Sequence, residues 1–258
     1  MEVYFLGTCA GTEPMPNRKH ASFVIKAQDR LYWFDAGEGC SQTAHIMGLD
    51  LLSVNKIVIS HTHMDHVGGL GNLLWNIRKL STIKNQNPRF GDIDLFIPNM
   101  QTWDGIWKIL KNTEGGFEAD FSIHPQLVAD GLLFDDGILS VTAYHNHHLQ
   151  QKGNILPWLS FTYRIESAGQ SIVYSGDVGD YTDMDVAIGD GCDALIVETG
   201  HLRIDGVYEY TCKKNIDKVF FHHCGREFLN APQESAKKIQ SLFGTKAVIC
   251  EDQMHVVL

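Results

Sequence analysis

The 258-residue sequence lacks the features that define several protein classes. Its six cysteines are scattered and no two have C-x-x-C spacing, which argues against a disulfide scaffold. No apolar run approaches the roughly 20 residues that a membrane-spanning helix requires. The N-terminal stretch MEVYFLGTC has neither a basic segment nor a long apolar one, so we expect no signal peptide. These absences favour a cytoplasmic protein with free thiols and no membrane partner.

Positive charge is also scarce. Lysine and arginine total 21 against 31 acidic residues, which gives a formal net charge of −10 and argues against a histone-like grip on nucleic acid. A content of 44% hydrophobic and 20% charged residues excludes a disordered or fibrous chain. The 13 histidines are the feature that stands out, and they indicate metal binding or acid–base chemistry.

Short β-type runs alternate with helical patterns along the whole chain. This alternation predicts α/β layering, and we expect one domain over residues 1–258. Segment 112–131 is the least regular, and we expect it to be an excursion over the surface. The expected strands are 3–6, 22–26, 31–35, 56–60, 93–97, 138–144, 160–165, 171–175, 194–198, 218–221 and 247–250, and the expected helices are 40–47, 70–80, 100–111 and 233–243.

The strongest signal is the run His61-Thr62-His63-Met64-Asp65-His66 directly after the apolar strand KIVIS. A tight loop after a strand can aim His61 and His63 at one metal ion and Asp65 and His66 at a second. Further candidate ligands follow other predicted strands, where open α/β folds place their sites: they are His145, His147, His148, Asp177, His222 and His223. Imidazole and carboxylate without thiolate fit zinc, manganese or iron in an open catalytic site.

With these ligands the sequence resembles the metallo-β-lactamase superfamily, and most closely its ribonuclease Z-like branch. Several segments carry the resemblance to motifs of that branch: F-L-G-T-C-A-G at 5–11, the R-x-x-x-S stretch at 18–22, F-D-A-G-E-G at 34–39, the metal motif at 59–66, G-L-G-N-L-L at 69–74, S-G-D at 175–177, H-H-C-G-R at 222–226 and E-D-Q-M at 251–254. The resemblance implies a four-layer αββα sandwich with a dimetal site at the edge between the two sheets.

Carried over by residue, the resemblance assigns the ligands. One ion is expected on His61, His63 and His148 and the other on Asp65, His66 and His222, with Asp177 bridging them. We prefer His148 to His145 and His147, which we expect on the loop surface. Asp35 is expected either to orient the metal loop from beneath or to cap the following helix.

The sequence also departs from the branch. The interval between His148 and Asp177 has no room for the inserted arm with which ribonuclease Z enzymes hold transfer RNA precursors. The G-H-S-T segment that supplies a second catalytic histidine is absent. His201, three residues after Glu198, either replaces that histidine or is an exposed loop residue.

The leading hypothesis is a dimetal hydrolase, with two divalent ions that are zinc or else manganese or iron, acting on a small or cyclic phosphodiester. Asp65 is expected to orient the attacking water, and Glu198 with His201 to protonate the leaving group. Arg18 and Arg226, with Lys19, are candidates for binding a small anionic substrate or an RNA backbone.

Three alternatives stay open. The first is a transfer RNA 3′-processing endoribonuclease. The second is a lactone or thioester hydrolase, for which tryptophans are candidate pocket walls, although packing is their default role: Trp75, Trp103, Trp107 and Trp158. The third is a non-catalytic, metal-containing ligand-binding module. A homodimer is compatible with the branch, but no interface is evident in the sequence.

Overall fold

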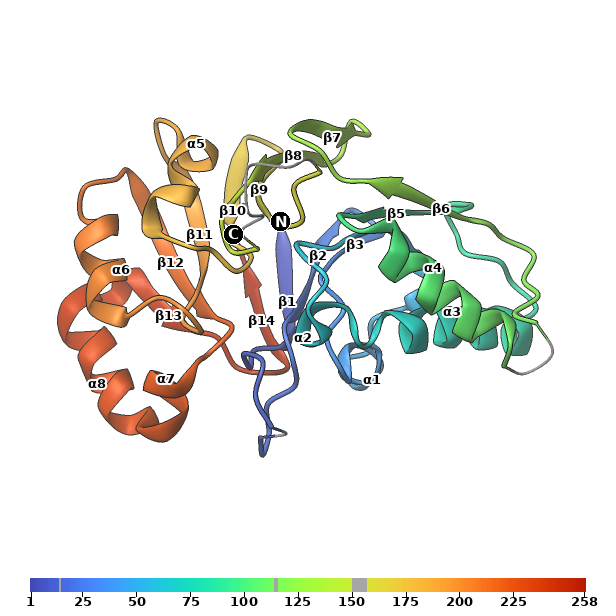
Figure 1. Cartoon of the computed structure of the whole chain (residues 1–258), viewed down its shortest axis with the longest axis horizontal. Helices are drawn as coiled ribbons and strands as arrows, with labels where there is room; N and C mark the ends of the chain where they lie inside the picture. The colour runs from blue at the N-terminus through green and yellow to red at the C-terminus, as the bar shows by residue number, and fades with distance from the viewer. Residues whose placement is uncertain (14, 114–115, 150–156) are drawn as a thin grey trace.

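Two seven-stranded β-sheets face each other in the computed structural model of the chain, which describes residues 1–13, 15–113, 116–149 and 157–258 (Figure 1). In sheet order, the first sheet consists of β14 (Met254–Val257), β1 (Glu2–Gly7), β2 (Ser22–Ala27), β3 (Arg30–Phe34), β4 (Val54–Val58), β5 (Ile93–Ile97) and β6 (Ile123–Leu127). The second consists of β13 (Ala247–Ile249), β12 (Ile216–His222), β11 (Cys192–Glu198), β10 (Gln170–Tyr174), β9 (Phe161–Ser167), β8 (Ser140–His145) and β7 (Gly131–Asp135).

Helices cover the outer face of each sheet, with α1, α3 and α4 on one side of the molecule and α6, α7 and α8 on the other (Figure 1). With the first sheet go α1 (Cys40–Ile46), η1 (Leu51–Ser53), α2 (Met64–Val67), α3 (Leu70–Lys84) and α4 (Met100–Lys111). With the second go η2 (Tyr181–Met184), α5 (Asp185–Ile188), α6 (Ile204–Thr211), α7 (Arg226–Asn230), α8 (Pro232–Phe243) and η3 (Gly244–Lys246). The expected four-layer αββα sandwich is therefore confirmed.

Strand alternation explains the layers. In β3, Trp33 packs under the helices while its neighbours Tyr32 and Phe34 face the other sheet, and all three are fully buried. In β11, Leu195 packs under α6 and α8 while Ile196 faces the first sheet. Successive residues of a strand point to opposite faces, so an apolar run such as RLYWF or ALIVE supplies both layers at once.

Each sheet is parallel in one half. The carboxyl ends of the parallel strands lie at one edge of the sandwich. Strands β3 to β6 are parallel in the first sheet and β10 to β13 in the second. The sheets are joined at the strand ends by backbone hydrogen bonds, with Phe161 N donating to Ser60 O (3.0 Å) and Cys224 N donating to Thr8 O (2.7 Å). The loops after β1, β4, β10, β11 and β12 therefore converge at one edge of the sandwich.

Segment 112–131 is not only the surface excursion expected from the sequence, because it includes the edge strand β6. The sequence IHPQL lacks an apolar alternation and contains Pro125, which only an edge strand tolerates. Strands β7 and β14 were also missed. In the described part of the chain, none of the helices combines the length and the apolar character needed to cross a bilayer.

Candidate active site

The loop after β4 arranges the predicted metal motif. Ile59 continues the strand by donating its N–H to Phe96 O (2.9 Å), and Ser60 N donates to Asp35 Oδ1 (2.6 Å). His63 then caps the short helix α2 in an extended conformation. The change from strand to helix within a few residues sends His61 and His63 to one side and Asp65 and His66 to the other.

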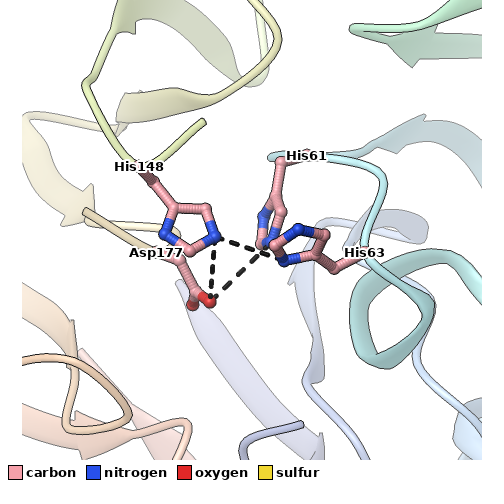
Figure 2. A group of neighbouring side chains, drawn as sticks. All are labelled: His61, His63, His148 and Asp177. Atoms are coloured by element: carbon pink, nitrogen blue, oxygen red, sulfur yellow. Dashed lines mark hydrogen bonds and ion pairs between the residues drawn. The ribbon is translucent and has the colours of Figure 1, made fainter. Parts of the chain in front are cut away.

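Four side chains form what we call the His61 group: His61, His63, His148 and Asp177. Figure 2 shows the three imidazoles and the carboxylate pointing toward one another. His148 Nε2 lies 3.2 Å from His63 Nδ1 and 3.8 Å from Asp177 Oδ2, and His61 Nε2 lies 3.7 Å from the same Asp177 oxygen. The structure thus brings together the three histidines and the aspartate expected for the first ion.

Four side chains form the His66 group: Asp65, His66, Asp177 and His223. His66 Nε2 lies 3.1 Å from His223 Nε2 and 3.4 Å from both Asp65 Oδ2 and Asp177 Oδ1. His223 Nδ1 is 3.2 Å from Asp177 Oδ1. Asp177 belongs to both groups and offers one carboxylate oxygen to each, as a bridging ligand would.

The arrangement fits divalent cations. Ser60 Oγ donates to Asp35 and so accepts from His61 Nδ1 (3.2 Å), which leaves a lone pair on His61 Nε2. That nitrogen, Asp177 Oδ1 and His223 Nδ1 are buried polar atoms with no hydrogen-bond partner. Native proteins rarely leave such atoms unpaired. Facing lone pairs of nitrogen and oxygen, without thiolate, make a donor set suited to zinc, manganese or iron.

The two groups differ in charge. Burial lowers the pKa of His61 well below its usual range and that of His148 to about 4, so these imidazoles are neutral near pH 7. Burial also opposes charge on His66, but Asp177 and Asp35 outweigh it and raise the His66 pKa well above its usual range. Asp177 and Asp35 therefore favour positive charge at His66.

Asp35 lies beneath the motif and is fully buried. Its Oδ2 accepts hydrogen bonds from Ser60 Oγ (2.7 Å), Tyr174 OH (2.6 Å) and His66 Nδ1 (2.7 Å). The last contact fixes the His66 tautomer and aims Nε2 at the site, as an orienting carboxylate does. The alternative, a helix cap, is wrong, because Gly39 occupies the position before α1.

His222, expected as a ligand, does not join either group. Its Nε2 donates to Gly7 O (2.8 Å), and its ring packs against Phe5, Phe23 and Tyr174 between the sheets. His222 is the last residue of β12 and points to the same face as Phe220, whereas His223 turns into the site with φ of 47°. His223 therefore takes the place assigned to His222, and strand alternation was the signal that could have shown it.

His145 and His147 lie outside both groups, as expected. His145 Nδ1 pairs with Asp130 (2.7 Å), and His147 Nδ1 pairs with Asp183 (2.5 Å). The His145 ring also stacks on Trp158 at 4.1 Å between ring centroids. Both histidines thus have carboxylate partners of their own on the loop.

A pocket of about 240 Å³ opens onto the two groups. His201 lies at its wall: its N–H donates to Glu198 Oε2 (2.7 Å) and its Nδ1 lies 3.2 Å from Glu198 Oε1. Glu198 is buried, whereas the His201 side chain is 47% exposed. The hydrogen bond with Glu198 raises the His201 pKa, although burial opposes it. The pocket is lined by Ala10, Gly11, Thr12, His63, Asp65, Asp177, Gly200, His201, His223, Gly225 and Arg226.

The two candidate substrate-binding arginines have different surroundings. Arg226 lines the pocket and pairs with Glu13. Arg18 does not line it. Its Nη1 donates to Thr8 Oγ1 (2.6 Å) and Cys250 O (3.1 Å), and its guanidinium lies 5.1 Å from the Phe228 ring centroid. The structure therefore gives Arg18 a bracing role between loops, and substrate binding by Arg18 stays a prediction.

Comparison with known proteins identifies the family. A sequence profile of the Anti-Pycsar protein Apyc1 family matches residues 1–188, which is more than half of the chain. The chain belongs to this family. The resemblance to the ribonuclease Z-like branch is confirmed as well: ribonuclease Z of Picrophilus torridus is 26% identical over 292 aligned positions, covering 92% of this chain and 91% of that protein.

Solved structures confirm the fold. Human tRNase Z, short form, superimposes with a TM-score of 0.73 at 21% identity and covers 100% of this chain and 99% of its own. The metallo-β-lactamase fold protein YhfI from Bacillus subtilis gives a TM-score of 0.74 at 15% identity, with coverage of 99% and 98%. Membership in the Apyc1 family, together with the histidine and carboxylate groups, makes the chain a metal-dependent hydrolase of the metallo-β-lactamase superfamily.

Proposed function

We propose that this Apyc1-family member hydrolyses a small or cyclic phosphodiester with two divalent metal ions, most simply zinc. The observation that carries the proposal is the pair of histidine and carboxylate groups sharing Asp177 at the floor of a pocket of about 240 Å³. Two divalent ions would carry more positive charge than the carboxylates of Asp65 and Asp177 can neutralise. The site would therefore attract a phosphate despite the net charge of −10.

The ions would be held by the His61 group and the His66 group. When bound, divalent ions supply Lewis acidity toward a phosphoryl oxygen and acidify water at neutral pH. Asp65 reaches the pocket, with a side chain that is 12% exposed, while its Oδ2 lies 3.0 Å from His223 Nε2. It is thereby placed to orient the attacking water and to accept its proton.

His201 would protonate the leaving group. Glu198 accepts from the His201 backbone and faces its Nδ1, so Nε2 is the nitrogen left to meet the substrate. A half-exposed imidazole held by a buried carboxylate has the arrangement of a general acid. It would give its proton to the departing alkoxide oxygen.

Substrate size is argued from the chain between His148 and Asp177. Strands β9 and β10 take up most of residues 157–176, and no arm is present there. Without an arm, a large RNA would lack contacts far from the reacting phosphate. Binding energy from such contacts normally contributes to the rate on a large substrate. A pocket of about 240 Å³ suits a compact ester.

Two alternatives are less well supported. The lactone or thioester hypothesis predicts a pocket lined by tryptophan. The residues lining this pocket do not include the four candidates Trp75, Trp103, Trp107 and Trp158. Trp103 and Trp107 instead stack on each other within the core under the helices. Transfer RNA 3′ processing remains the second candidate, because the Picrophilus relative is named ribonuclease Z and the sequence resembles that branch.

The test compares substrates on zinc- and manganese-loaded protein. We expect turnover of bis(p-nitrophenyl) phosphate and of cyclic mononucleotides at rates well above those on precursor transfer RNA or a lactone panel. His63→Ala should abolish turnover, and His147→Ala, a matched histidine outside both groups, should retain it. Efficient and accurate cleavage of precursor transfer RNA would restore the processing nuclease, and metal-loaded inertness on every ester would favour the non-catalytic module.

A further inference from the structure

An ion pair lies beside the pocket, with Arg226 lining it and Glu13 next to the lining residue Thr12. Arg226, in the first turn of α7, forms a two-pronged contact with Glu13 of the loop after β1. Arg226 Nη1 donates to Glu13 Oε1 (3.1 Å), and Nη2 donates to Oε2. The two side chains are 54% and 60% exposed, so the pair lies at the pocket rim and not at its floor.

The loop backbone is held by hydrogen bonds, whereas the Glu13 side chain is exposed at the loop surface. Ala10 N donates to Cys224 O (3.1 Å), and His20 Nε2 contacts Thr12 O (3.3 Å). A Cβ on Gly11 would come within 2.9 Å of Asp65 Oδ2, so this loop lies directly on the His66 group. The Glu13 carboxylate accepts hydrogen bonds from Arg226 and from its own backbone amide. Rotation of one side chain would therefore free the guanidinium without moving the loop.

The contact has the geometry of phosphate recognition. A guanidinium binds a carboxylate and a phosphate through the same pair of parallel N–H groups. Exposed ion pairs are weak, because water solvates both partners well. An anionic ligand entering the pocket can therefore replace the carboxylate at little cost.

We propose that Glu13 is a built-in competitor for Arg226, and that the substrate's phosphate must displace its carboxylate in order to bind. Arg226 then contacts the phosphate oxygens, while Glu13 sets the affinity threshold for anions at the rim. This inference rests on the proposed function for the identity of the anion. It adds a specificity-determining residue, Glu13, that does not touch the reacting atoms.

The experiment is a double-mutant cycle on metal-loaded protein. Calorimetry measures the dissociation constant of inorganic phosphate, and kinetics measure KM and kcat on bis(p-nitrophenyl) phosphate. We expect Glu13→Gln to tighten phosphate binding and lower KM by about two- to fivefold, the scale of an exposed ion pair, with kcat unchanged. Arg226→Gln should weaken phosphate binding and raise KM. Adding Glu13→Gln to Arg226→Gln should then change neither phosphate binding nor KM.

Asp205→Asn is the matched control, because Asp205 also forms an exposed ion pair, with Lys238 on the outer helices. It should change neither constant. Weaker phosphate binding and a lower melting temperature in Glu13→Gln would show a structural brace and overturn the proposal. An equal gain from Glu13→Gln with and without Arg226 would show charge repulsion through space and would also overturn it.

Calorimetry separates this inference from the proposed function. A chain that turns over no phosphodiester but shows the expected cycle for phosphate supports the Glu13 inference and contradicts the function. Normal turnover with no effect of Glu13→Gln contradicts the inference alone.

Discussion

The His61 group and the His66 group share Asp177 but are built differently. In the His61 group, His61 is buried and hydrogen-bonded to Ser60, but His63 is exposed, His148 is partly buried, and these two contact each other. In the His66 group, His66 and His223 are at most 2% exposed, and Asp35 holds His66 from beneath. A fixed, buried ligand set loses less freedom on binding, so we expect the His66 group to hold its ion more tightly and the His61 group to exchange first with solvent.

The largest expected effect comes from the residue common to both groups. Asp177→Ala removes a carboxylate oxygen from each, so both ions should be lost and turnover should fall to background. Elemental analysis of the purified variant checks the metal content. Full occupancy would remove Asp177 from both ligand sets, and loss of a single ion would confine it to one of the groups.

A second pair of variants separates neighbouring histidines. His223→Ala should empty the His66 group and leave the His61 group loaded, so metal content should fall by about one ion per chain. His222→Ala should retain both ions and instead lower the free energy of unfolding by about 2–5 kcal/mol, the usual range for truncating a packed core side chain. Metal analysis and thermal melting measure the two effects. Loss of metal in His222→Ala alone would contradict the placement of His223.

The third prediction concerns the chemistry beside the His61 group, where His201 Nδ1 lies 3.6 Å from Asp177 Oδ2. His201→Ala should slow esters with poor alkoxide leaving groups by about 10²–10⁴, the usual contribution of a general acid. It should barely affect p-nitrophenolate esters, whose leaving group departs without a proton, and it should not change metal content. Equal losses on both ester types would exclude the acid role.

The smallest expected effect is a change in metal affinity at one group and not at the other. Asp35→Asn keeps the side-chain shape but weakens the hydrogen bond that aims His66. Metal affinity should fall about 10–100-fold at one of the two positions and stay nearly unchanged at the other. Competition with a coloured chelator resolves the two affinities. A uniform loss at both positions would show that Asp35 supports the loop as a whole and not His66 in particular.

Most residues of the site could be predicted from local sequence. The motif from His61 to His66 needs only one strand end and one helix start to bring its side chains together, so it could be predicted from spacing. Helix 100–111 was predicted with its observed bounds for a similar reason, since Asn99 caps it locally. His148 and Asp177, which follow other strands, also lie where they were expected, but the histidine after β12 does not. The histidine that joins the His66 group after β12 is one residue later than expected, because that strand's register decides which histidine faces the site.

Long-range contacts were equally invisible in the sequence. Nothing near Arg18 indicates that Thr8 and the Cys250 carbonyl hold its guanidinium. Strand β6 escaped because its pairing with β5 is made by the backbone, and its side chains carry no apolar pattern. Contacts of this kind arise from the assembled sheets.

Anomalous X-ray diffraction at the zinc edge, on crystals of zinc-loaded protein, tests the central claim most directly. We expect two anomalous peaks on either side of Asp177, one bordered by His61, His63 and His148 and the other by Asp65, His66 and His223. The peak at the His66 group should persist at chelator concentrations that remove the other. A single peak, or a peak bordered by His222, would contradict the account.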